Sequence, residues 1–152
     1  MSTFRQNKYL LPALILVVMI ATGFFFFNSA KQDSSQTPKT VISAQTLEEQ
    51  YGLRVNLIAV TAAGGLVDLR LKIVDAEKAK QLLQDKKNFP ALFIPDENVT
   101  LNVPEDTKGE EIEFVDESNI FLMYPNAGNV TKRGTMVTVI FGDIALEDIE
   151  AK

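Results

Sequence analysis

Carboxylates are the most numerous side chains in this sequence that could take part in chemistry, and nine of them fall between positions 96 and 117. Hard oxygen ligands gathered on loops would suit calcium. The Asp-x-Asp-x-Asp-Gly spacing of an EF-hand loop is absent, however, and residues 116–119 are only a fragment of it. We therefore interpret the stretch as solvated loops that keep the domain soluble and discourage edge pairing. The nine are Asp96, Glu97, Glu105, Asp106, Glu110, Glu111, Glu113, Asp116 and Glu117.

Histidine and cysteine are both absent from the sequence. Their absence excludes most nucleophile–base pairs, thiolate catalysis and the usual zinc and copper sites, including that of a cupredoxin. A glycosidase-type pair of carboxylates would need a cleft lined by aromatic residues, and the chain has no tryptophan and three tyrosines. We expect a protein without enzymatic activity and without a cofactor or metal.

Five basic residues are the candidate binding residues. Arg54, Arg70 and Lys72 are expected on one face of a β-hairpin, where they would form a small basic patch for an anion or a partner. Lys132 and Arg133 lie in a long loop before the last strands, and loops on a rigid scaffold commonly carry binding residues. The alternative for the first three is a solvated sheet face on which isolated charges contribute little.

The hairpin that would position the first three residues is the clearest regular structure in the sequence. Apolar and polar residues alternate from Leu53 to Val60 and from Leu66 to Val74, and the loop 61–65 between them contains two glycines. A register in which paired residue numbers add to 126 brings the apolar faces together. It pairs Leu53 with Ile73, Arg54 with Lys72, Val55 with Leu71, Asn56 with Arg70, and Leu57 with Leu69.

Two short helices are expected beside the strands. The first is capped by Ser43 or Thr46 and ends at Tyr51, and Gly52 suits the left-handed position after a helix. The second has Asp75 as its N-cap and extends to Lys87, with basic residues in the last turn where the helix dipole favours cations. It is expected to cross from one sheet to another.

The remaining strands are short and separated by turn residues. Prolines 90, 95 and 104 would push the strands Phe89–Ile94 and Asn98–Val103 toward sheet edges. The strand Thr135–Phe141 has a second face that is partly apolar, so it should be central or covered on both sides. Gly142 and Asp143 would mark a bulge after it. This pattern resembles the architecture of an immunoglobulin-like antiparallel β-sandwich with one or two short helices. The predicted strands are Phe89–Ile94, Asn98–Val103, Ile112–Val115, Ile120–Tyr124 and Thr135–Phe141.

An apolar segment precedes the domain. Tyr9 to Phe27 is nineteen residues without a charged side chain. At about 1.5 Å per residue a helix of that length spans about 28 Å, close to the hydrocarbon thickness of a bilayer. Arg5 and Lys8 precede it, so the positive-inside bias places the N-terminus in the cytoplasm and the domain outside. We predict one transmembrane helix that serves as a signal-anchor in the cell membrane.

Cleavage as a signal peptide is the alternative for this segment. Cleaved signals usually have an apolar region of about 7–15 residues before a small-x-small site. Here the apolar run is longer, and Asn28 stands where the first small residue is required. The expected organisation is therefore a cytoplasmic N-terminus (1–8), a transmembrane helix (9–27), a linker (28–40) and an extracytoplasmic domain (41–152).

The charge of the chain beyond position 30 limits the partners. Its 13 basic and 20 acidic residues give a net charge of −7. This sign argues against nucleic acid and against anionic headgroups as ligands. We expect a non-catalytic single-pass membrane protein whose domain makes protein–protein contacts with a membrane or envelope protein, as an accessory subunit or interaction module. The alternative is a sensing domain for a small anion or carbohydrate.

Overall fold

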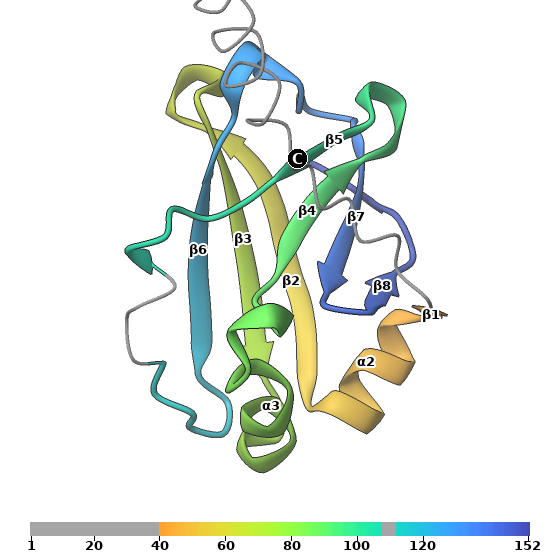
Figure 1. Ribbon diagram of the computed structural model, residues 1–152, viewed down its shortest axis with the longest axis vertical. Coiled ribbons are helices and arrows are strands. Elements are labelled where there is room, and N and C mark those ends of the chain that lie inside the picture. The colour runs from red at the N-terminus through yellow and green to blue at the C-terminus, as the bar shows by residue number, and fades with distance from the viewer. Residues whose placement is uncertain (1–39, 108–111) are drawn as a thin grey trace, which may run out of the picture. The chain divides into compact units, whose positions relative to one another are not determined.

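The computed structural model describes residues 40–107 and 112–152 (Figure 1). Within these ranges the chain is mainly β, with two α-helices and nine strands in two sheets. The prediction of a mainly β fold with one or two short helices is confirmed. The predicted transmembrane helix 9–27 lies outside the described residues. No helix within the described ranges is long and apolar enough to cross a membrane.

The smaller sheet has three antiparallel strands in the order β2, β3, β6. β2 and β3 form the predicted hairpin, and β6 lies beside β3 at one end of the sheet (Figure 1). The strands are β2 (Leu53–Thr61), β3 (Leu66–Ile73) and β6 (Asn119–Pro125).

The larger sheet has the order β1, β8, β7, β4, β5, with β9 paired to β7. All its pairs are antiparallel except β1 with β8, which is parallel. β7 has three neighbours, and the prediction that it is central is confirmed. The strands are β1 (Thr40–Ile42), β4 (Ala91–Ile94), β5 (Val99–Leu101), β7 (Met136–Phe141), β8 (Ile144–Leu146) and β9 (Ile149–Glu150).

The two sheets share one hydrophobic core. Leu69 of β3 and Phe141 of β7 are both fully buried. Tyr124 of β6 is also fully buried, and its hydroxyl donates to the backbone carbonyl of Pro90, just before β4, at 2.8 Å. Burial raises the pKa of this phenol above its usual value. The hydrogen bond therefore links the two sheets through the core.

The segment after β8 also joins the sheets. β9 pairs with β7, and the backbone of Lys152 pairs with β2 on the other side. Val60 N–H donates to the Lys152 carbonyl at 2.8 Å, and Lys152 N–H donates to the Ile58 carbonyl at 2.9 Å. This segment therefore covers part of the β2 edge.

Both predicted helices are present. α2 (Ala44–Tyr51) has Ser43 as its N-cap and ends at Gly52, whose φ is 64°. A side chain at Gly52 would overlap the backbone oxygen of Asp75, so this position requires glycine for two reasons.

The second helix is shorter than predicted. α3 (Ala76–Leu83) has Asp75 as its N-cap and connects β3 of one sheet to β4 of the other, as expected. The turn 86–88 is a separate 3₁₀-helix instead of the last turn of α3. The physical reason is Asp85, whose carboxylate accepts from the Lys87 N–H at 3.0 Å and so caps a new turn.

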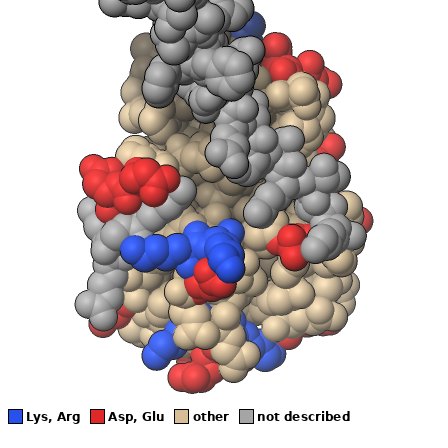
Figure 2. Space-filling model, viewed as in Figure 1, with Lys and Arg blue, Asp and Glu red and all other residues tan. Residues whose placement is uncertain are grey.

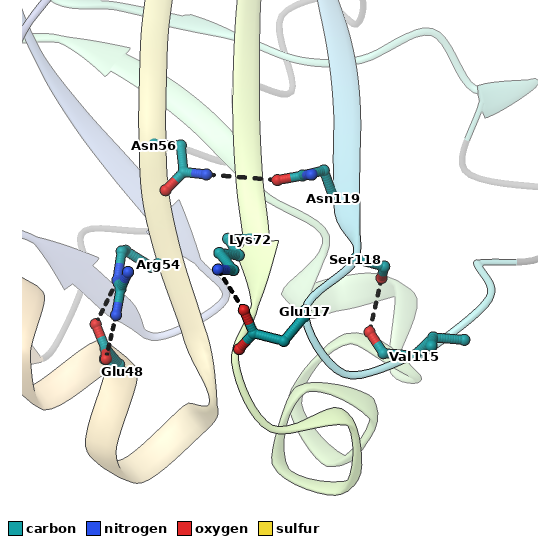
Figure 3. A network of polar contacts seen from close by, with 8 residues as sticks. All are labelled: Glu48, Arg54, Asn56, Lys72, Val115, Glu117, Ser118 and Asn119. Carbon is teal, nitrogen blue, oxygen red and sulfur yellow. Dashed lines mark hydrogen bonds and ion pairs between the residues drawn. The ribbon is translucent and has the colours of Figure 1, made fainter.

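The hairpin register is correct at one end and wrong at the other. Leu53, Arg54 and Val55 pair as predicted, but a bulge at Asn56 shifts the rest of β2 by one residue. Leu57 therefore pairs with Arg70, and Ile58 takes the buried position opposite Leu69. The alternation expected up to Val60 stops at Leu57, because residues 57–60 are all apolar, and the sequence there fits either register. The bulged Asn56 donates from Nδ2 to Oδ1 of Asn119 at 3.4 Å (Figure 3).

Three other local predictions are wrong. Residues 112–115 are not a strand, because they have no strand partner among the described residues. Their apolar side chains Ile112 and Phe114 instead pack against the core, partly buried. β4 is an interior strand, since the prolines lie just outside its four residues and leave its N–H groups free for both neighbours. Gly142 and Asp143 form a two-residue turn, with Gly142 at φ 59°, that pairs Phe141 with Ile144.

Candidate functional site

One face of the three-stranded sheet carries most of the candidate residues, and we call it the outer face. It lies opposite the buried side chains of Leu69, Leu71, Leu122 and Tyr124. Because side chains alternate along a strand, the register assigns its members. They are Arg54, Leu57, Ala59 and Thr61 on β2, Leu66, Asp68, Arg70 and Lys72 on β3, and Asn119, Phe121, Met123 and Pro125 on β6.

Arg54 and Lys72 are cross-strand neighbours on this face, and each pairs with a carboxylate (Figure 3). Arg54 Nε and Nη2 both lie 2.6 Å from the carboxylate oxygens of Glu48 on α2. Lys72 Nζ lies 2.5 Å from Oε2 of Glu117. The hydrogen bonds between Arg54 and Glu48 lower the pKa of the carboxyl and raise the pKa of the guanidinium. An external anion would have to compete with these internal partners.

Arg70, the third predicted cation, is held by a buried carboxylate. Asp68 is 4% exposed, and its Oδ2 accepts from Arg70 Nε at 2.9 Å and lies 2.8 Å from Nη2. The Arg70 guanidinium also lies 5.5 Å from the centre of the Phe121 ring on the neighbouring strand. This arrangement is a cation–π contact. Arg70 is therefore oriented over β6 by one acid and one aromatic ring.

Phe121 and Met123 are the two large apolar side chains that β6 exposes. Phe121 is 59% exposed and Met123 is 43% exposed, and they lie two residues apart on the outer face. Sequence reasoning identified the strand but missed these residues as a surface. The available signal was that residues 120–124 are all apolar, so that one face of the strand must remain uncovered unless something packs on both.

The backbone of β6 has an open edge. Two hydrogen bonds show which β6 residues bond to β3. They run from Ile73 N–H to the Ser118 carbonyl and from Asn126 N–H to the Gly65 carbonyl, both at 2.9 Å, so the backbone groups of the even-numbered residues of β6 face β3. In this arrangement the N–H and C=O groups of Phe121 and Met123 point away from β3. Within residues 40–107 and 112–152 no backbone group bonds to them.

The other sheet edges are less available. β1 and β5 are three residues long, and the edge of β2 is occupied at Ile58 and Val60 by Lys152. β6 has seven residues without a charged side chain, and the register records no bulge along it. Natural edge strands are usually protected by charges, bulges or prolines. Here the protective residue is Pro125, at the last position.

Lys132 and Arg133 lie far from the other three cations. Lys72 pairs with Asn119 at the start of β6, whereas the loop that carries Lys132 and Arg133 follows the end of the strand at Pro125. Seven residues of strand separate the two ends by roughly 20 Å. The structure therefore does not bring the five predicted residues into one site.

The loop itself is anchored by Asn126, which is 4% exposed. Its Nδ2 donates to the carbonyls of Gly64 and Thr131, both at 2.8 Å, and its Oδ1 accepts from Thr131 N–H at 3.0 Å. Lys132 and Arg133 are exposed immediately after this anchor. They therefore extend from a fixed base. No pattern in the sequence singles out Asn126 as the residue that holds it.

Charged side chains on the face in Figure 2 form small separate groups of both signs with uncharged surface between them. Among the described residues no three carboxylates are placed to hold a metal ion. A groove of about 440 Å³ lies between α3 and residues 112–114, and its mixed lining includes the apolar residues Leu83, Phe89 and Phe114. Two lysines and two glutamates surround it, so the groove has no strong preference for one sign of charge.

No protein-family model, curated protein or solved structure matches the chain. The outer face combines exposed apolar side chains, an oriented arginine and a strand edge whose backbone groups at Phe121 and Met123 have no partner in the described part of the chain.

Proposed function

We propose that this chain is a non-catalytic, single-pass membrane protein whose extracytoplasmic domain makes protein–protein contacts close to the bilayer. The helix 9–27 would hold it in the cell membrane, with the N-terminus in the cytoplasm. The domain 41–152 would be an immunoglobulin-like β-sandwich that acts as an accessory subunit or envelope interaction module. Its partner would be a membrane or envelope protein.

The observation that carries this proposal is the open β6 edge beside Phe121 and Met123. Extended partners add to such an edge through backbone hydrogen bonds and gain specificity from alternate side chains. Exposed aromatic and methionine side chains are also enriched where proteins meet. The internal pairing of Arg54, Arg70 and Lys72 favours a contact surface over an anion site, because these cations already have partners.

The test is purification of the full chain from mild detergent with Phe121→Ser and Met123→Ser variants. Partner protein should co-elute with the wild type and be reduced several-fold for each variant. Met136→Ser is the matched control, since Met136 is also a strand methionine and is 40% exposed. Equal recovery of the partner with Met123→Ser and Met136→Ser would contradict the proposal.

Binding of a small anion or carbohydrate is the second candidate, and the groove beside α3 and the exposed Lys132 and Arg133 favour it. A ligand that binds the native state raises the melting temperature by mass action. A thermal-shift panel of anions and sugars would detect this. The paired change Lys132→Ser with Arg133→Ser should abolish any shift caused by an anion at the loop, and a shift that persists would place the ligand elsewhere.

A further inference from the structure

We infer that the partner of the β6 edge is a second copy of this chain, and that two copies pair β6 with β6 in antiparallel orientation about a two-fold axis at Leu122. This inference rests on the proposed contact function and names its partner. The result would be one continuous six-stranded sheet in the order β2, β3, β6, β6, β3, β2.

The backbone allows this pairing in a symmetric register centred on Leu122. Because Phe121 and Met123 have the outward-pointing N–H and C=O groups, they can form hydrogen-bonded pairs with Met123 and Phe121 of the second copy. Leu122 then faces Leu122 of the second copy on the two-fold axis. The interface is isologous, so it closes as a dimer instead of extending into a fibre.

The side chains are complementary in the same register. Phe121 of one copy lies beside Met123 of the other on the outer face, and sulfur–aromatic contacts of this kind are favourable. Each row of neighbouring side chains across the four central strands of the dimer has the order Arg70 and Phe121 of one copy, then Met123 and Asp68 of the second copy. The two ends of each row thus have opposite charges, and no like charges face each other across the new pairing.

The ends of β6 limit the pairing to this central region. Pro125 lacks an N–H group and would lie opposite Asn119 of the second copy, so the ladder stops there. None of the seven β6 residues is charged, which means that nothing along the strand repels an identical strand. The other edges differ, since β1 and β5 are too short and Lys152 occupies β2.

One strand edge gives a small interface, and interfaces below about 1,000 Å² are weak or transient. A common membrane tether compensates for this, because it confines both copies to one surface and raises their effective concentration. We therefore expect the dimer to form in membranes, where both copies are confined to one surface.

The experiment is disulfide crosslinking in membranes, for which the cysteine-free chain is well suited. Full-length Phe121→Cys and Met123→Cys chains with different tags are expressed together and oxidised. In the inferred register positions 121 and 123 of opposite copies have Cα atoms about 5.5 Å apart, within disulfide range. Identical positions are diagonal neighbours at about 7–8 Å and should react poorly.

The expected result is a mixed disulfide dimer several-fold above the dimer from either variant alone. Phe121→Cys with Met136→Cys is the control for random collision. A mixed yield equal to that control would overturn the inference. If the dimer is absent while Phe121→Ser still loses a different co-purified protein, self-pairing is refuted and the proposed function stands. If neither the dimer nor any partner is found, both fail.

Discussion

Asn126→Ala should destabilise the domain strongly although it removes no apolar contact of the core. The Asn126 side chain makes three hydrogen bonds, at 2.8, 2.8 and 3.0 Å, to Gly64 and to both backbone groups of Thr131. These bonds tie the loop after β6 to the turn between β2 and β3. Alanine would leave two carbonyls and one N–H without a partner in a region where Thr131 is 1% exposed.

The magnitude follows from the number of bonds. A buried backbone group left without a partner costs about 1–3 kcal/mol, and a typical intramolecular hydrogen bond contributes about 1 kcal/mol. Water entering the loop would satisfy some of the groups, so we take the lower figure for each bond. The expected loss in the free energy of unfolding is about 3 kcal/mol. For a domain near 100 residues this lowers Tm by roughly 10 to 20 °C.

Thermal and urea unfolding of the full chain in mild detergent, followed by circular dichroism, would measure this loss. Asn102→Ala is the matched control, because Asn102 is exposed and lies in an irregular segment. It should change the free energy by no more than about 0.5 kcal/mol. A loss below about 1 kcal/mol for Asn126→Ala would refute the reasoning, since it would mean that the three bonds do not hold the loop.

Three further predictions concern the fold. Ile58→Ala should lower the free energy of unfolding by about 2–5 kcal/mol and Leu57→Ala by less than about 1 kcal/mol, as measured by urea titration. A larger loss for Leu57→Ala than for Ile58→Ala would support the register without a bulge. Gly52→Ala should lower the free energy of unfolding by at least about 3 kcal/mol. Gly134→Ala should lower it by about 1–2 kcal/mol, because Gly134 also has a positive φ of 88° but has open space around it. Equal losses in thermal melts would argue against the overlap at Gly52. The raised pKa of Tyr124 means that only the unfolded state ionises just above its usual 10.0. The contribution of Tyr124 to the free energy of unfolding is therefore constant below that pH and falls by about 1.4 kcal/mol per pH unit above it. Tyr124→Phe should remove this component, and an unchanged pH slope in alkaline urea titrations would contradict the assignment.

Local features of this fold could be predicted because they depend on residues close in sequence. Ser43 and Asp75 cap their helices, Gly52 ends the first, and the glycine-containing loop joins β2 to β3. Each of these depends on the conformational preference or hydrogen-bonding ability of a single residue. The same reasoning failed for Asn56, because a bulge among apolar residues is decided by packing against the other sheet.

The candidate surface could be predicted only in part. Alternation placed Arg54, Arg70 and Lys72 on one face, and the structure agrees. Their carboxylate partners come from distant segments, as Glu117 illustrates for Lys72, so the neutralisation was not visible in the sequence. The open edge of β6 depends on strand order, which no local pattern encodes.

The hydrogen bond between Tyr124 and Pro90 gives the domain a built-in optical reporter. The chain has no tryptophan, so its three tyrosines dominate its near-ultraviolet absorbance and intrinsic fluorescence. Tyr124 of the smaller sheet is fully buried, and its phenol donates at 2.8 Å to the carbonyl of Pro90, which directly precedes β4 of the larger sheet. Any opening between the sheets hydrates this ring, and the resulting spectral shift can be followed in the native sequence without a dye or an added chromophore.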